Sequence, residues 1–520
     1  MTVLAPSAPA RGLARDHLLV AGCAAAFVGL CALFWPFVAD DALIVGRYAR
    51  NAAAGHGLVY NIGEYVSALT SPLHALLETA LAWLGLDPVQ AYRLLAPALV
   101  LAGWLAAVRQ TGLGGAALLL FSALSLFSPF LALWTVGGLE TPLLACLATL
   151  FVARLSRMVR ADAATGADLL WLGGLAGLMF VTRYDSALVS VPLLLAVLTV
   201  AYRRPALWAG AALCLALVGG WLLFAALYYG DVFPTSYYLK LADGGRAPLD
   251  SLSALLNFLL LSGLFLLPLL LRPAPLASRA PLARAILRGG AISAVLFLLY
   301  ASRASGQHMM FGYRLFLPYL MGASLVLVLA LPRARPGLAG LFVGWQAVMA
   351  AVVTFAGVNP APLTRLPGLQ RAYAEYEFVT PAAHKIHMDT LRADAEAIAA
   401  HWEATGRQEQ PRIYLRAGGT GYWLPDFYVY ESLVSYRHAC GDPMLTMVGA
   451  SHYMQQLGFS KTGTMVEDRG RARPDIADDA PLLFETEVDW MGPHAVGYLY
   501  GPEPAALDLG DRIHSPCIAG

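Results

Sequence analysis

The feature that most constrains the fold of this chain is a series of long apolar segments joined by short polar connections. The first segment, residues 18–39, has 22 residues without a charge, which is enough to cross a bilayer as a helix. Only 13% of the 520 residues are charged and 58% are hydrophobic, as in proteins that cross a membrane several times. The net charge of +1 gives no support to a nucleic-acid partner. We therefore expect an α-helical polytopic membrane protein.

Ten further apolar segments bring the expected number of transmembrane helices to about eleven. They cover about residues 94–108, 115–136, 141–156, 169–182, 186–202, 206–228, 252–271, 289–302, 315–331 and 337–358. Arginines are clustered in alternate connections, and such connections face the cytoplasm. The alternation holds only if residues 72–86 do not span. We expect that segment to be an interfacial helix on the outer surface, starting at Ser71-Pro72.

The other connections then all face outside. They are residues 40–92, 137–140, 183–185, 229–251, 303–314 and the chain after 358. This division gathers charged side chains on one face: Asp40, Asp41, Glu140, Asp185, Lys240, His308 and Arg314. A single acid near the end of a span is an ordinary interface residue, but a group on one face points to an active site there.

Residues 365–520 have a different composition, with frequent charges and alternating helix-like and strand-like patterns. A helix is expected at 382–405, and strands at 412–416, 427–436 and 495–500. This predicts a soluble C-terminal α/β domain outside the membrane, following a membrane domain of residues 1–364. Gly418 to Gly421 is expected to form a tight turn rather than a phosphate cradle. Cys440 and Cys517 form a disulfide if the domain is extracytoplasmic, or stay two free thiols.

Asp40 and Asp41 open the first outer loop, at the point where the first apolar segment stops. Residues 42–54 are expected to form a short helix, with Asp41 capping its start. Capping accounts for one aspartate and leaves the other unexplained. A loop of about fifty residues that is not a simple linker is usually functional. Within it, His74 and Glu78 lie four residues apart and are expected to be a solvated pair on the interfacial helix.

Five stretches resemble bacterial membrane glycosyltransferases of the GT-C superfamily. They are DDALIVGRYARNAAAGHGLVYNIGEYVSALTSPLHALL at 40–77, WTVGGLETPL at 134–143, TRYD at 182–185, YYGDVFPTSYYLK at 228–240, and GQHM followed by YRLFLP within 306–318. The similarity is greatest to the arabinofuranosyltransferase group that terminates mycobacterial arabinan. Lipid A aminoarabinose transferases and protein O-mannosyltransferases are more distant. Two positions depart from the family pattern, with Tyr184 in place of proline and Gln307 in place of aspartate.

The resemblance implies a GT-C fold and a glycosyltransferase in the bacterial inner membrane, with the C-terminal domain in the periplasm. The enzyme would move a sugar, such as arabinofuranose or a related pentose, from a polyprenyl-phosphate donor to an extracytoplasmic glycan, lipid or protein. A polymerase or ligase of lipid-linked saccharides is an alternative. A transporter or flippase is another, but transporters carry their charges near the midplane and often contain inverted repeats. Membrane lipids are expected to surround the spans.

The chemistry requires a general base for the acceptor hydroxyl and cations for the departing lipid phosphate. Asp41 is predicted as the base, with Asp40 as its neighbour or as the base itself. The predicted donor-binding residues are Arg47, His56, Glu140, Arg183, Asp185, Tyr237, Tyr238, Lys240, His308 and Arg314. No spacing of histidines and cysteines indicates a metal site. A divalent cation, Mg²⁺ or Ca²⁺, is optional because the acidic residues could supply oxygen ligands.

Overall fold

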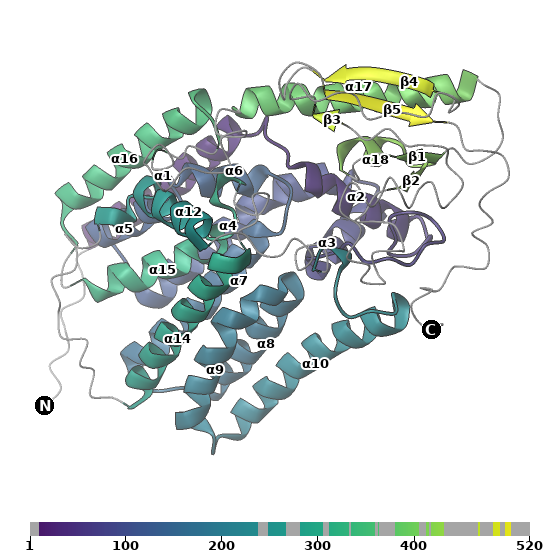
Figure 1. Cartoon of the computed structure of the whole chain (residues 1–520). Coiled ribbons are helices and arrows are strands. Elements are labelled where there is room, and N and C mark those ends of the chain that lie inside the picture. The colour runs from purple at the N-terminus through teal and green to yellow at the C-terminus, as the bar shows by residue number, and fades with distance from the viewer. Residues whose placement is uncertain are drawn as a thin grey trace, which may run out of the picture.

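The structure is a computed structural model, and it describes residues 10–237, 248–266, 281–304, 311–331, 334–358, 362, 380–404, 412–414, 418–430, 466–467, 482–488 and 495–500. Most of the described residues are helical (Figure 1). The helices up to residue 228 are α1 (Ala10–Leu33), α2 (Asp40–Ala53), α3 (Pro72–Trp83), α4 (Pro88–Thr111), α5 (Gly115–Leu124), α6 (Pro129–Val136), α7 (Thr141–Ala161), α8 (Gly166–Thr182), η1 (Tyr184–Ser186), α9 (Ala187–Ala201) and α10 (Pro205–Tyr228). After these come α12 (Pro248–Leu261), η2 (Leu264–Leu266), α14 (Pro281–Ala304), η4 (Phe311–Tyr313), α15 (Leu317–Ala330), α16 (Pro336–Phe355), α17 (Pro381–Ala404) and α18 (Gly419–Trp423).

Seven helices within the described ranges are long and apolar enough to cross a membrane. The apolar helices α8 and α15 are shorter, with 17 and 14 residues. The segment 115–136, expected as one span, is instead two helices, α5 and α6, bent by 61°. The break has a local cause, because proline at the first position of α6 suits a helix start and Ser128 accepts a hydrogen bond from Leu131 N–H there. The helix expected at 72–86 is α3, which has only 12 residues.

The connections that were assigned to opposite faces form two separate sets of contacts. At the predicted outer face, Ala39 N–H donates to the carbonyl of Gly137 over 2.9 Å. At the predicted cytoplasmic face, Arg154 donates to Asp168 over 3.2 Å, between the end of α7 and the start of α8. The structure thus supports the division made from arginine positions. Which set faces the cytoplasm stays a prediction.

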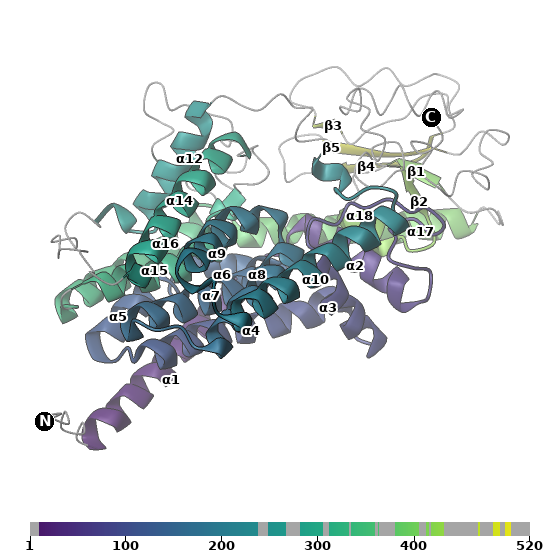
Figure 2. The ribbon, with the colours of Figure 1, turned by 90° about the horizontal axis from the view of Figure 1, so that it is seen from below.

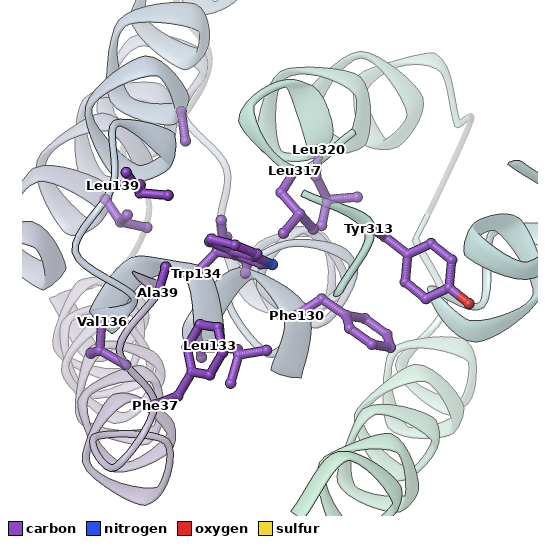
Figure 3. Close-up of a cluster of buried hydrophobic side chains, with 14 of the residues drawn as sticks. Phe37, Ala39, Phe130, Leu133, Trp134, Val136, Leu139, Tyr313, Leu317 and Leu320 are labelled. Carbon is purple, nitrogen blue, oxygen red and sulfur yellow. The ribbon is translucent and has the colours of Figure 1, made fainter. Parts of the chain in front are cut away.

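Aromatic side chains form the core directly beneath the predicted outer face (Figure 3). Trp134 of α6 and Phe37, at the end of the first apolar segment, meet edge to face with ring centroids 5.4 Å apart. Phe130 meets Tyr313 of η4 in the same way at 5.2 Å. All four side chains are buried. This packing holds the ends of three apolar segments in fixed positions, because each ring fills space between the others.

The C-terminal part contains helices and strands, in agreement with the expected α/β pattern. The strands are β1 (Arg412–Tyr414), β2 (Tyr428–Tyr430), β3 (Val466–Glu467), β4 (Leu482–Val488) and β5 (Ala495–Tyr500). β1 and β2 pair in parallel, and β5 lies between β3 and β4 in an antiparallel sheet. These elements lie at the end of the molecule where α2 is found (Figures 1 and 2). The boundary at 364/365 and both Cys440 and Cys517 lie outside the described residues.

Candidate functional site

Five charged side chains form a continuous line of contacts across the ends of α2, α7, α8 and α15. Arg183 donates through Nε and Nη2 to both oxygens of Asp185, over 3.0 and 2.6 Å. Its Nη1 donates to Glu140 over 2.9 Å. Arg314 donates through Nη2 to both oxygens of Glu140, over 2.7 and 2.8 Å, and its Nη1 lies 3.9 Å from Asp41. The structure therefore brings five of the predicted site residues together.

Glu140 is the centre of this line and is completely buried. Burial alone would raise the pKa of its carboxyl group, but the charges of Arg314 and Arg183 outweigh burial and hold that pKa well below its usual range. Burial opposes the charge of Arg183 too, yet Asp185 and Glu140 hold its pKa well above the usual value. Glu140 is therefore ionised at neutral pH. Three carboxylates and two guanidiniums leave the line with one net negative charge.

A glycine turn places Glu140 against the start of α2. Gly138 has φ +85°, a conformation that favours glycine. A Cβ atom on Gly138 would lie 2.9 Å from the Cβ of Ala42, which is too close for a side chain there. In the GGLE part of the GLETPL-like stretch, glycine is thus needed so that the backbone can approach α2, and Glu140 supplies the carboxylate.

Asp40 and Asp41 have different surroundings, although they are adjacent. Both lie in the first turn of α2, whose N-cap is Ala39, so the expectation that Asp41 caps this helix was wrong. The Asp41 side chain is 64% exposed and faces Arg314. Oδ1 of Asp40 accepts a hydrogen bond from the backbone N–H of Gly419, far along the chain. The open carboxylate of the pair is therefore Asp41.

Arg47 and His56 lie in places unlike those of the five connected residues. The buried guanidinium of Arg47 donates to four backbone carbonyls: Tyr60, Gly421, Leu424 and Phe427. These contacts give Arg47 a role in holding two segments together. His56 is exposed, after the end of α2. Within the described ranges, Arg47 makes its hydrogen bonds with these carbonyls and not with Glu140 or Arg314.

The remaining predicted donor-site residues come from two connections. Tyr237 is 42% exposed, and its ring stacks on Phe233 with centroids 4.5 Å apart. Tyr238, Lys240 and His308 lie outside the described residues. Their predicted roles stay predictions.

Sequence reasoning missed Arg93, which fixes the geometry behind the site. Its guanidinium donates to the carbonyl of Val136 over 2.6 Å, to that of Phe37 over 3.1 Å, and to that of Trp35. Arg93 therefore joins the end of the first apolar segment to the end of α6, and so joins Asp41 to Glu140 through the backbone. A signal was present, because an arginine at the outer end of a span runs against the positive-inside pattern.

The pair His74 and Glu78 differs from its expected state. Both side chains are completely buried between α3 and its neighbours, so the expectation of a solvated pair was wrong. Nε2 of His74 lies 3.3 Å from Oε1 of Glu78. The ring of His74 packs on Tyr92 of α4 with centroids 4.2 Å apart. α3 lies against α2 and α4 rather than on the surface alone, which explains why polar residues at helical spacing became buried.

The acidic residues of the site are mostly engaged with protein donors. Glu140 and Asp185 accept from arginines, and Asp40 accepts from Gly419 N–H. Within the described ranges, no group of three or more His, Cys, Asp or Glu side chains is placed to hold a metal ion. Mg²⁺ or Ca²⁺ prefers several oxygen ligands, and the oxygens of these three carboxylates that bind protein donors would have to be shared with such an ion. The optional divalent cation stays a prediction.

No protein-family model matches the sequence. No curated protein matches it either. Among solved structures, the chain is similar to ArnT from Cupriavidus metallidurans bound to undecaprenyl phosphate, with a TM-score of 0.55 and 16% identity over 92% of this chain and 98% of that chain. At this identity, the similarity shows a shared fold.

Two other solved structures are similar at lower scores. ArnT from Cupriavidus metallidurans in the apo state has a TM-score of 0.43 and 16% identity, over 84% of this chain and 80% of that chain. Arabinosyltransferase EmbB from Mycobacterium smegmatis has a TM-score of 0.32 and 15% identity, over 69% of this chain and 42% of that chain.

Proposed function

We propose, from the premise that this chain has the fold of the GT-C membrane glycosyltransferases, that it transfers a sugar from a polyprenyl-phosphate donor to an acceptor outside the membrane. The observation that carries the proposal is the line of contacts from Asp185 through Arg183, Glu140 and Arg314 to the exposed Asp41. It places an open carboxylate beside a cation that a buried carboxylate holds in position.

Asp41 is the general base in this proposal. The acceptor hydroxyl oxygen attacks the anomeric carbon of the sugar, and Asp41 takes the hydroxyl proton as the new C–O bond forms. The bond from the anomeric carbon to the phosphate oxygen breaks, and its electron pair leaves with the lipid phosphate. A carboxylate suits the base role only if it can reach substrate, and Asp41 is the exposed member of its pair.

Arg314 is the proposed partner of the departing phosphate. Negative charge grows on that phosphate in the transition state, and a fixed cation stabilises it. Nη2 of Arg314 is held by Glu140, while Nη1 points toward Asp41, where the reaction would occur. The guanidinium also lies over the ring of Trp134, with Cζ 5.1 Å from the ring centroid. These contacts fix its plane, and a planar guanidinium can donate two bonds to one phosphate.

Several finer features of the proposal come from the sequence. The sugar is an arabinofuranose or a related pentose, and the acceptor is a glycan, lipid or protein. The membrane is the bacterial inner membrane, with the C-terminal part in the periplasm. In support, the fold is that of a protein solved with undecaprenyl phosphate. Lys240, His308 and Tyr238 complete the donor site in this proposal.

The test is transfer by the purified protein from synthetic polyprenyl-phosphate sugars, with Asp41→Asn as the key variant. We expect this variant to lose about 100- to 10,000-fold in turnover, the usual contribution of a general base. Asp162→Asn is a matched control, because Asp162 is exposed after α7 with φ 47°, which asparagine also tolerates. Near-normal turnover in Asp41→Asn contradicts the base assignment, and no transfer from any lipid donor by the unaltered protein contradicts the proposed function.

A further inference from the structure

Residues 418–430, here called the clamp segment, are fastened to the first outer loop by several side chains. Arg47 donates to three carbonyls of the clamp segment: Gly421, Leu424 at 3.1 Å and Phe427 at 2.6 Å. A single guanidinium can do this because it carries five donors in a rigid plane. The same side chain donates through Nε to Tyr60 within the first loop, over 2.9 Å. Arg47 thus joins the loop to a segment more than 370 positions further along the chain.

Three more side chains outside the clamp segment hold it in place. The side chain of Asn61 pairs with the backbone of Val429 in both directions: its Nδ2 donates to the carbonyl over 2.9 Å, and its Oδ1 accepts from the N–H over 3.0 Å. The guanidinium of Arg50 lies over the ring of Tyr422, with Cζ 3.6 Å from the centroid. The hydroxyl of Tyr422 in turn donates to Asp87 over 2.8 Å. The attachment is therefore specific along the whole of residues 418–430.

Asp40 is the contact of the clamp segment that lies closest to the proposed base. The N–H of Gly419 donates to Oδ1 of Asp40. A Cβ atom on Gly418 would overlap the carboxylate of Asp40, so this carboxylate lies directly against the backbone of the glycine. Consecutive residues of a helix point about 100° apart. The bond to Asp40 therefore ties the first turn of α2, which also carries Asp41, to the clamp segment.

We propose that the clamp segment is a positioning element of the catalytic site, and that Asp40 is its anchor rather than a second catalytic acid. This inference rests on the proposed function, because it assumes that Asp41 acts on substrate. The bond from Gly419 to Asp40 holds the first turn of α2 so that Asp41 faces Arg314. The pair of aspartates then has divided roles, in which one binds protein backbone and the other stays open to substrate.

The roles are separated by two substitutions of Asp40. Asp40→Asn keeps a carbonyl oxygen that can accept from Gly419 N–H, whereas Asp40→Ala removes the acceptor. We expect turnover of Asp40→Asn to stay within about fivefold of the unaltered protein, and turnover of Asp40→Ala to fall by about 10- to 100-fold, the usual range for a misplaced catalytic group. If Asp40 is the base, the two variants lose activity equally, and the proposal fails.

Hydrogen–deuterium exchange of a peptide that covers residues 418–430 gives a readout that does not depend on activity. We expect faster exchange in Asp40→Ala than in Asp40→Asn, since only the first loses the bond to Gly419. Asp41→Ala is the matched control, and its exchange should equal that of the unaltered protein. Unchanged exchange in Asp40→Ala contradicts the anchor role even if the protein proves to have a different activity. Failure of the proposed function would leave the exchange result intact.

A glycine substitution tests the same contact from the other side. Gly418→Ala adds a Cβ where the Asp40 carboxylate lies, so we expect it to displace Asp40 and to speed exchange of residues 418–430. Gly340→Ala is the control, because nothing lies within 4 Å of a Cβ at that position in α16. Turnover should fall by about tenfold or more in Gly418→Ala and stay unchanged in Gly340→Ala. Equal exchange and turnover in the two variants would overturn the proposal.

Discussion

Two glutamates of this protein are both completely buried, yet they are in opposite electrostatic situations. Glu140, before α7, accepts three hydrogen bonds from Arg183 and Arg314. Glu78, on α3, lies 3.3 Å from His74, and neither of its oxygens has a hydrogen-bond partner in the part of the chain that the structure describes. Burial raises the pKa of Glu78, and the nearby His74 only partly opposes this. The pKa of Glu140 is held well below the usual range by two arginines.

The difference shows that burial alone does not decide the charge of a carboxyl group. Burial disfavours the ionised form at both positions, and the number of cationic donors determines whether that effect is offset. At the proposed catalytic site, two guanidiniums keep Glu140 ionised, so it can hold Arg314 beside Asp41. At His74 and Glu78, no comparable set of donors is present among the described residues. The surroundings of Glu140 stabilise a negative charge on its carboxyl group, whereas the surroundings of Glu78 do not.

The largest expected effect follows the loss of the Glu140 charge. In Glu140→Gln, the guanidiniums of Arg314 and Arg183 lose a buried counter-charge. We expect the free energy of unfolding to fall by about 3–5 kcal/mol, as when one partner of a buried ion pair is removed, and transfer activity to fall with it. Thermal unfolding in detergent, followed beside a transfer assay, measures both.

The control for that variant is Glu78→Gln, the same substitution at an equally buried position. If the two variants lose similar stability, the contrast between the regions is broken. If Glu140→Gln is as stable as the unaltered protein, the arginines do not depend on this carboxylate. A loss of activity without a loss of stability would assign Glu140 to chemistry alone.

A smaller loss of stability is expected when the planar guanidinium of Arg183 is replaced by an amine. Arg183 makes two bonds to Asp185 and one to Glu140, through three different nitrogens. Lysine in Arg183→Lys keeps the charge but presents one nitrogen, so it cannot make this set. We expect a loss of about 1–3 kcal/mol in stability, the cost of charged hydrogen bonds left unmade.

That prediction is checked by a double-mutant cycle with Asp185→Asn. A coupling energy near zero between the two substitutions contradicts a direct role for the pair. A coupling of the expected size shows that the line of contacts, and not burial alone, stabilises this region.

The smallest effect is expected at Glu78, and it depends on pH. Because the pKa of Glu78 is raised in the folded protein, its contribution to stability is present below the unfolded pKa of about 4.3 and is lost as pH rises through the folded value. Glu78→Gln, which cannot ionise, should match the unaltered protein near pH 4. Toward pH 7, the free energy of unfolding of Glu78→Gln should equal or exceed that of the unaltered protein. Unfolding of both proteins across this pH range measures the difference.

The opposite sign is expected for Glu140, whose depressed pKa gives stability that is present above about pH 4.3 and lost only as pH falls through the folded value. If Glu78→Gln loses stability relative to the unaltered protein as pH rises, the conclusion that burial raises the pKa of Glu78 is contradicted. That result would show that Glu78 is ionised and well paired, as Glu140 is.

Much of the site could be predicted because its residues lie at the ends of apolar segments. Positive-inside topology placed Asp41, Glu140, Asp185 and Arg314 on one face, and the structure joins them in one line of contacts. The helix at 382–405 and strands near 412, 428 and 495 also followed from local patterns. These predictions succeed because hydrophobic periodicity acts over short distances along the chain.

Other features could not be predicted in this way. The burial of His74 and Glu78 depends on how α3 packs on α2 and α4, and a four-residue spacing looks the same on a solvated helix. The bend between α5 and α6 was hidden in a segment that is apolar throughout. In both cases the sequence pattern was compatible with two arrangements, and packing between distant segments selected one of them.

By itself, the sequence determined a membrane protein with many spans, an acidic pair at the start of its first outer loop, and the face on which its charged residues gather. Only the tertiary structure decided which of the two aspartates binds protein backbone and which stays exposed. Gly419, 379 positions beyond Asp40, supplies the N–H that occupies one aspartate, while Asp41 stays exposed beside Arg314. The physical reason is that local patterns set the direction of a side chain on its helix. Whether its oxygens are free depends on donors that folding brings from elsewhere in the chain.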